Sequence, residues 1–140
     1  MEDLALARLA LSIATKAHDG QFRRDGKTPY IDHPIAVAFA MPTQRLKALA
    51  YLHDVIEDTL ITLTYLKELG FPQDILNSLN RLTKRPFESY VEYIIVCSCD
   101  SDSRVVKIAD IKHNLSTLES KNKTMRDKYE LTLYVLEKLK

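Results

Sequence analysis

Apolar residues recur every three or four positions along most of the chain. Between Asp3 and Ala17, for example, the sequence places Leu4, Ala7 and Leu11 on one face of a helix. No segment keeps the strict alternation of a half-buried strand. The run from Tyr90 to Val96 is rich in β-branched and aromatic residues, but no other segment offers a partner strand, so it is assigned to a helix. The pattern predicts an all-α fold.

Glycine, proline and charged clusters interrupt this periodicity and set the expected helix ends. Helices are predicted over residues 3–17, 34–40, 44–58, 62–69, 72–82, 89–99, 103–116 and 124–139. Asp3 and Thr43 are suitable N-caps for the first and third of these. Residues 20–34 contain two Gly, two Pro and five charged side chains and form the longest irregular segment. Long loops in compact domains are often functional.

The composition limits the possible classes of protein. A chain of 140 residues, 46% hydrophobic, suits one domain with one core, and we predict a single-domain bundle of about seven or eight helices. Twenty Lys and Arg balance nineteen Asp and Glu, so no global charge attracts nucleic acid or a membrane. Without a signal peptide or a membrane-spanning run, a soluble cytoplasmic protein is expected. The oligomeric state is left open.

Two cysteines, Cys97 and Cys99, stand one residue apart in an apolar run. A disulfide across so short a loop would be strained, and a zinc site would need further thiols. We therefore expect two buried free thiols.

Two of the four histidines, His18 and His53, are followed directly by aspartate. The first lies at the end of a predicted helix, where a histidine is explained by the nearby carbonyl groups. The second lies in an apolar segment that should be buried, and an unpaired Asp54 carboxylate there would cost several kcal/mol. A bound cation would remove that cost.

The spacing around His53 and Asp54 extends this candidate metal site. Glu57 follows His53 by four residues and Asp54 by three, and Asp58 follows Asp54 by four, which places all four on neighbouring positions of one predicted helix. Further ligands must come from elsewhere in the chain, and the candidate ligands are His33, His53, Asp54 and Asp110. This nitrogen and oxygen set suits Mn²⁺, Fe²⁺ or Zn²⁺ better than Ca²⁺. The alternative is an ordinary buried hydrogen-bonded network.

Several cations lie near these candidate ligands in the sequence, and phosphate is the anion that they would suit. They are Arg23, Arg24 and Lys27 in the irregular segment, and Lys107 three residues before Asp110. Asn114, four residues after Asp110, adds an amide that suits a sugar hydroxyl or a phosphate oxygen. The alternatives are a solvated loop for the arginines and a surface amide for Asn114.

Four segments of the chain, residues 17–26, 28–38, 52–59 and 106–115, carry a resemblance to a known family. In this order they resemble the hydrolase domain of the RelA/SpoT family, and most of all the stand-alone small alarmone hydrolases within the HD phosphohydrolase superfamily. The resemblance covers about residues 5–120, and it implies that residues 1–140 form one HD-type phosphohydrolase domain.

The resemblance implies removal of pyrophosphate from the 3′ position of (p)ppGpp, which gives GDP or GTP. One Mn²⁺ would be held by the four candidate ligands, while Glu57 and Asp58 would position and deprotonate the attacking water. Arg23 and Arg24 would lie along the nucleotide, Asn114 would contact ribose or phosphate, and Thr117 would line the pocket. Because no synthetase region follows, the chain is expected to degrade the alarmone and not to make it.

The sequence departs from the family in places and leaves two other functions open. Ser116 stands where the family commonly has Arg, and residues 83–102 match poorly. One alternative is an HD phosphohydrolase acting on another nucleotide, such as an adenosine alarmone. The other is a catalytically silent HD-fold interaction module, against which the intact Glu57 and Asp58 argue.

Overall fold

The computed structural model describes residues 1–139, and within this range the chain forms nine α-helices and no β-strand. The helices are α1 (Asp3–Ala17), α2 (Asp32–Phe39), α3 (Gln44–Leu52), α4 (Val55–Asp58), α5 (Leu63–Glu68), α6 (Gln73–Leu82), α7 (Tyr90–Cys97), α8 (Ser101–Thr117) and α9 (Lys123–Lys138). The predicted all-α fold is confirmed. Residue 140, the last of the predicted domain, lies outside the described residues.

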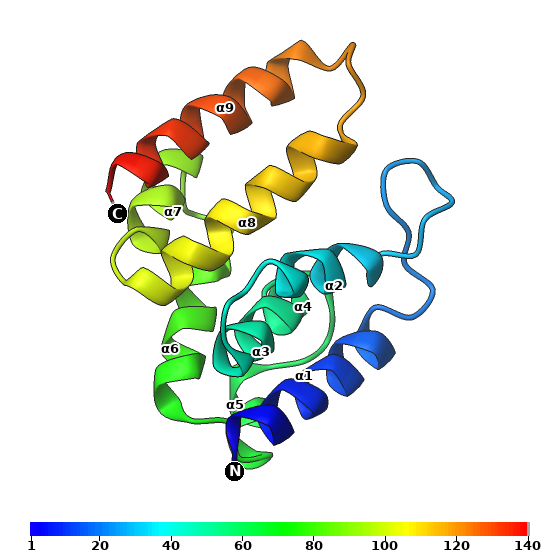
Figure 1. Ribbon diagram of the computed structural model, residues 1–140, viewed down its shortest axis with the longest axis vertical. Helices are drawn as coiled ribbons and strands as arrows, with labels where there is room; N and C mark the ends of the chain where they lie inside the picture. Colours follow the sequence, from blue (N-terminus) through cyan, green and yellow to red (C-terminus); the bar gives the residue numbers. More distant parts are fainter. Residues whose placement is uncertain (140) are drawn as a thin grey trace.

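The helices pack around α3 and α8. Helix α1 lies against α3, and α2 lies between α3 and α8. Helices α8 and α9 form an antiparallel hairpin on the far side of the molecule from α1 (Figure 1). The loop between α1 and α2 projects toward the end of this hairpin (Figure 1).

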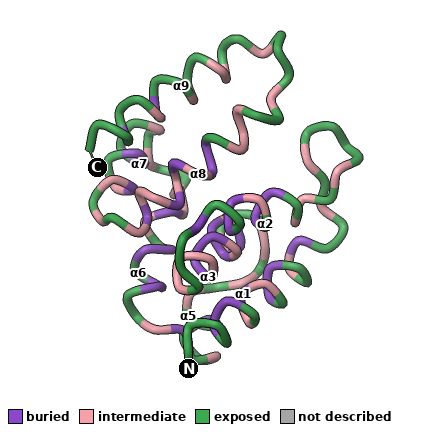
Figure 2. Tube along the Cα trace, viewed as in Figure 1, coloured by how far each residue is buried: buried purple, intermediate pink, exposed green. Residues whose placement is uncertain are grey.

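One hydrophobic cluster connects these elements. Its buried side chains come from most of the helices, including Leu6 of α1, Val37 of α2, Leu49 of α3, Leu79 of α6 and Ile111 of α8. Buried positions recur along the inner sides of these helices, whereas α9 and the α1–α2 loop are largely exposed (Figure 2). The predicted stripe of α1 is right for Ala7 but wrong for Leu4, which is exposed, and for Leu11, which is only partly buried. The buried side of α1 is formed by Leu6, Ala7, Ala10, Ile13 and Ala14, which keep a helical periodicity on a neighbouring face.

Side-chain caps fix where several helices begin. Thr43 accepts a hydrogen bond from the backbone of Leu46 and caps α3, as predicted. Asp100 accepts from Ser103 and starts α8 two residues before the predicted position. At α1 the N-cap is Glu2, and Asp3 lies in the first turn, so the predicted Asp3 cap is wrong by one residue.

The helix predicted over residues 44–58 is broken at His53 and Asp54. The carbonyl of Ala50 accepts hydrogen bonds from both the backbone N–H and the Nδ1 of His53, at 3.3 and 2.6 Å. In a continuous helix this carbonyl would accept a hydrogen bond from the backbone N–H of Asp54. Because His53 takes that place, the series of helical hydrogen bonds ends here. Asp54 becomes the N-cap residue of the single turn α4.

The two cysteines differ in exposure. Both are free, but Cys97 is buried and Cys99 is exposed. Side chains two residues apart on a helical turn point about 200° apart, so one core cannot bury both. The prediction of a buried thiol is right for Cys97 and wrong for Cys99.

None of the helices between residues 1 and 139 has both the length and the apolar character needed to cross a membrane.

Leu49 provides a test of this packing, because its side chain is 1% exposed in the middle of α3. The Leu49→Ala variant should lose about 2–5 kcal/mol of unfolding free energy through lost burial and the cavity that remains. Leu60, which is 99% exposed, supplies the matched control, and Leu60→Ala should stay within about 0.5 kcal/mol of wild type. Urea unfolding followed by circular dichroism measures both, and equal losses would contradict the assigned core.

Candidate metal centre and adjoining pocket

The four predicted ligand residues meet at one point. His33 comes from α2, His53 and Asp54 from the break between α3 and α4, and Asp110 from α8, and one ligand atom of each lies within 4.8 Å of the others. His33 Nε2 is 2.7 Å from Asp110 Oδ1, and His53 Nε2 is 2.9 Å from Asp54 Oδ2. His33, His53 and Asp110 are buried, and Asp54 is partly buried.

The helix break makes this convergence possible for His53 and Asp54. Neighbouring residues on a continuous helix diverge by about 100°, so both could reach only an ion placed between their directions. Because α3 ends at Leu52 and α4 begins at Val55, the two residues lie in a turn and direct their ligand atoms toward each other.

The contacts of the His53 ring indicate that the centre of the four-residue cluster requires a positive charge. Its Nδ1 donates to the Ala50 carbonyl, so its Nε2 presents a lone pair to carboxylate oxygens of Asp54 and Asp110, 2.9 and 3.4 Å away. This buried Nε2 has no hydrogen-bond partner of good geometry. A lone pair and two anionic oxygens repel each other unless a proton or a metal ion stands between them.

The titration of the same histidine leads to the same conclusion. Burial lowers the pKa of His53, but the charge of Asp54 and the hydrogen bonds that a protonated Nε2 would donate to the Asp110 and Asp54 carboxylates outweigh burial and raise that pKa well above its usual value. Two imidazole nitrogens and two carboxylate oxygens around one point form a donor set that suits a divalent transition metal. The residues therefore fit a metal ion.

Asp110 is paired with Lys107, a residue that the sequence analysis assigns to phosphate binding. Lys107 Nζ donates to Asp110 Oδ2 at 2.8 Å and lies 4.9 Å from the centre of the Tyr93 ring. Burial raises the pKa of Asp110, but the charge of Lys107 outweighs it, and the pKa lies well below the usual value. Lys107 was expected to meet substrate phosphate, whereas its ammonium is occupied by Asp110.

Two residues that the sequence analysis missed orient the cluster. His113 Nδ1 lies 2.7 Å from His33 Nδ1, and the Tyr30 hydroxyl donates to Asp54 Oδ2 at 2.5 Å. His113 follows Asp110 by three residues on α8, a spacing that would have revealed it. Tyr30 lies in a loop, where no periodicity applies.

Glu57 and Asp58 lie beside the cluster on the single turn α4. One carboxylate oxygen from each, and one from Asp54, lie within 4.8 Å of one another. Glu57 accepts a hydrogen bond from the backbone of Lys84 at 2.9 Å. Burial, followed by the charge of Asp54, raises the pKa of both Glu57 and Asp58. A carboxylate with a raised pKa next to a cation site is suited to accept a proton.

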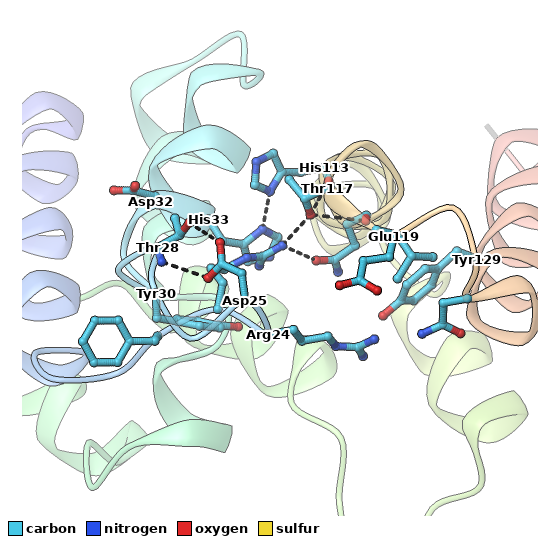
Figure 3. A pocket seen from close by; sticks show the side chains of 15 residues that line it. Arg24, Asp25, Thr28, Tyr30, Asp32, His33, His113, Thr117, Glu119 and Tyr129 are labelled. Atoms are coloured by element: carbon cyan, nitrogen blue, oxygen red, sulfur yellow. Dashed lines mark hydrogen bonds between the residues drawn. The ribbon is translucent and has the colours of Figure 1, made fainter.

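A pocket of about 700 Å³ adjoins the cluster, between the α1–α2 loop and the α8–α9 hairpin (Figure 3). His33 lines this pocket and also belongs to the cluster. Arg24 faces the pocket opposite Glu119 and Tyr129. The expected substrate residues Arg23, Arg24, Asn114 and Thr117 all line the pocket, whereas Lys27 does not.

Arg23 ties the loop to α8. Its guanidinium donates to Thr117 Oγ1 at 2.8 Å and to Asn114 Oδ1 at 3.2 Å. Asn114 in turn donates to Asp110 Oδ1 at 3.2 Å. Arg23 and Asn114 are therefore not a solvated loop residue and a surface amide, but parts of one network that reaches the cluster.

Asp25 gives the loop its shape. Its carboxylate accepts from the hydroxyl and the backbone N–H of Thr28 and from the backbone N–H of Lys27. The hydrogen bonds from Thr28, followed by that from Lys27, lower the pKa of Asp25 to about 2. The turn closes through Gly26, whose φ of 71° suits glycine. Lys27 lies exposed in this turn, away from the pocket lining.

The Lys107–Asp110 pair yields a stability prediction. Lys107→Met leaves the buried Asp110 carboxylate without its cation, and the metal-free protein should lose about 3–5 kcal/mol of unfolding free energy. Lys112→Met on the same helix is the control, since Lys112 is more than half exposed in its pair with Glu137 and should cost less than about 1 kcal/mol. Denaturant unfolding with chelator present measures both, and a Lys107 loss no larger than the control would refute the pairing.

The chain is similar to several known proteins. No family model matches it. It is 38% identical over 122 residues to the guanosine-3′,5′-bis(diphosphate) 3′-pyrophosphohydrolase of Haemophilus influenzae, a match covering 77% of this chain and 18% of that protein. It is 34% identical over 127 residues to the bifunctional (p)ppGpp synthase/hydrolase SpoT of Escherichia coli, covering 81% of this chain and 18% of SpoT. The chain thus spans about a fifth of the length of these curated relatives.

A shorter relative and a solved structure cover much more of their own length. The fold is similar to that of a structure described as a metazoan ortholog of SpoT, with a TM-score of 0.77 and 22% identity, covering 96% of this chain and 85% of that one. The guanosine-3′,5′-bis(diphosphate) 3′-pyrophosphohydrolase MESH1 of Xenopus tropicalis is 34% identical over 130 residues, covering 84% of this chain and 72% of MESH1. Since this match spans most of both proteins, the chain belongs to the guanosine-3′,5′-bis(diphosphate) 3′-pyrophosphohydrolase family.

Proposed function

We propose that this chain is a metal-dependent hydrolase that removes pyrophosphate from the 3′ position of (p)ppGpp and leaves GDP or GTP. The observation that carries the proposal is the His–Asp cluster, which has a site for a cation and adjoins a pocket with arginines on its wall. The printed functions of the relatives support the choice of substrate. The partner is then a small nucleotide, and a cytoplasmic location stays a prediction.

The proposed metal ligands are His33, His53, Asp54 and Asp110. We propose Mn²⁺ as the ion, with Fe²⁺ or Zn²⁺ as alternatives, because all three accept mixed nitrogen and oxygen ligands. When bound, such an ion lowers the pKa of a coordinated water and neutralises phosphate charge. Tyr30, Lys107 and His113 orient the ligands through their hydrogen bonds to Asp54, Asp110 and His33.

Glu57 and Asp58 are proposed to position the attacking water and to accept its proton. Their oxygens lie close to Asp54, and their raised pKa values favour taking up a proton. The water oxygen forms a bond to the phosphorus next to the 3′ oxygen, and the bond between that phosphorus and the 3′ oxygen breaks. The 3′ oxygen takes up a proton, and pyrophosphate leaves.

The pocket residues are proposed to hold the nucleotide. Arg23 and Arg24 supply positive charge where the chain as a whole carries only +1. Asn114 and Thr117 hold the Arg23 guanidinium and border the same cavity. A volume of about 700 Å³ lies within the range of small-molecule sites. In this proposal Lys107 supports Asp110, and Lys27 meets only the outer part of a bound phosphate chain.

Metal content tests the ligand assignment without substrate. Purified protein loaded with Mn²⁺ and then desalted should retain about one ion per chain, and Asp54→Ala should lose it because one of four ligands is gone. Asp19→Ala is a matched control, since Asp19 follows a histidine in the same way but is exposed and outside the cluster. Elemental analysis gives the ratio, and retention of the ion by Asp54→Ala would remove Asp54 from the site.

An activity panel tests the proposed reaction. With Mn²⁺, the wild-type protein should release pyrophosphate from ppGpp and pppGpp, and Glu57→Gln should keep the metal but lose about 10²- to 10⁴-fold in rate. Glu130→Gln, on the exposed side of α9, is the control with unchanged turnover. Faster release from ppApp would favour another nucleotide as substrate. No release from any of these nucleotides would favour the silent interaction module.

A further inference from the structure

Helix α4 is too short to hold Glu57 and Asp58 in place by itself. It is a single turn, Val55–Asp58, and it is followed by Thr59 in an extended conformation and by Leu60, which is 99% exposed. An isolated turn is unstable, and its last carbonyl groups have no partners within the helix. The position of Asp58 must therefore be fixed by contacts from other segments.

Gln21 provides such a contact from a segment far away in the sequence. Its Nε2 donates to the backbone carbonyl of Asp58 at 3.0 Å. The backbone of Gln21 is itself held on both sides, because its N–H donates to the His18 carbonyl and its carbonyl accepts from the N–H of Tyr30. A fixed side chain therefore caps the C-terminal end of α4.

His18 determines which way the Gln21 amide faces. The Asp58 carbonyl can only accept, so the amide nitrogen of Gln21 must face it and the amide oxygen must face His18. His18 Nδ1 lies 2.8 Å from that oxygen and must therefore carry a proton. The His18 ring is 2% exposed and lies 4.9 Å from the Tyr30 ring, whose hydroxyl donates to Asp54. His18 thus adjoins the supports of both Asp54 and Asp58.

The other ring nitrogen of His18 argues against a purely space-filling role. His18 Nε2 is buried and has no hydrogen-bond partner. A buried unsatisfied polar atom reduces stability, so an apolar side chain would serve packing better than histidine does here. The hydrogen bond from Nδ1 to Gln21 is the feature that an apolar side chain would lack.

We propose that His18 and Gln21 are positioning residues that lock the backbone of Asp58 against the metal centre. The proposal rests on the proposed function for its effect on the reaction, but the lock itself is a property of the metal-free chain. It gives His18, the histidine of the first His-Asp dipeptide, a role in placing Asp58.

Gln21→Met tests the lock, because methionine keeps the length of the side chain but cannot donate. In metal-free protein the backbone amides of residues 55–61 should exchange with deuterium about 5-fold faster, as expected for the loss of one hydrogen bond. In the loaded enzyme kcat should fall about 10- to 100-fold, while the KM for ppGpp and the metal content stay within about 2-fold. Gln73→Met, which removes a hydrogen bond on the surface of α6, is the matched control.

Two variants of His18 supply the rescue experiment. The amide nitrogen of Asn takes the place of Nδ1, whereas that of Gln takes the place of Nε2, so His18→Asn should keep the donor to Gln21 and His18→Gln should lose it. We expect kcat and amide exchange near wild type in His18→Asn and changed as for Gln21→Met in His18→Gln. Equal behaviour of the two variants, or unchanged exchange in Gln21→Met, would overturn the proposal. An inactive wild-type protein whose exchange responds as described would instead refute the proposed function and leave the lock standing.

Discussion

The structure depends on the need to place positive charge between two carboxylates in its interior. Asp54 and Asp110 direct oxygens toward the same two histidine nitrogens, and both are largely removed from water. Mutual repulsion of such groups is costly in the interior, so the arrangement requires a proton or a metal ion between them. Lys107 neutralises one outer oxygen of Asp110, but the inner oxygens face the histidines.

The residues of this cluster are held in three different ways: by helices packed in the core, by a break between two helices and by a single helical turn. His33 and Asp110 belong to α2 and α8, which pack against each other, so the histidine–carboxylate contact between them follows from core packing. His53 and Asp54 lie where the Ala50 carbonyl ends α3, and their directions follow from that interruption. Glu57 and Asp58 stand on one turn that is held by the backbone of Lys84 and the side chain of Gln21.

The sequence predicts the parts of this arrangement that obey a periodicity. The repeat of apolar residues predicts the helices, and the apolar segment around Asp54 identifies that carboxylate as a candidate ligand. The break at His53 was missed because it depends on a side chain bonding to a carbonyl of the preceding turn, which leaves no mark on spacing. Tyr30 and Gln21 were missed because they act from a loop, where three-dimensional proximity alone brings them to the site.

Lys107 shows why charge in a sequence does not identify its partner. Three residues before Asp110 on one helix, it is equally compatible with binding substrate phosphate and with pairing to that aspartate. Burial decides between the two, because an ammonium beside a buried carboxylate gains more from that carboxylate than from a solvated anion. The arginines of the loop differ from Lys107, because they lie on the wall of the pocket and the partners that hold Arg23 there, Asn114 and Thr117, carry no charge.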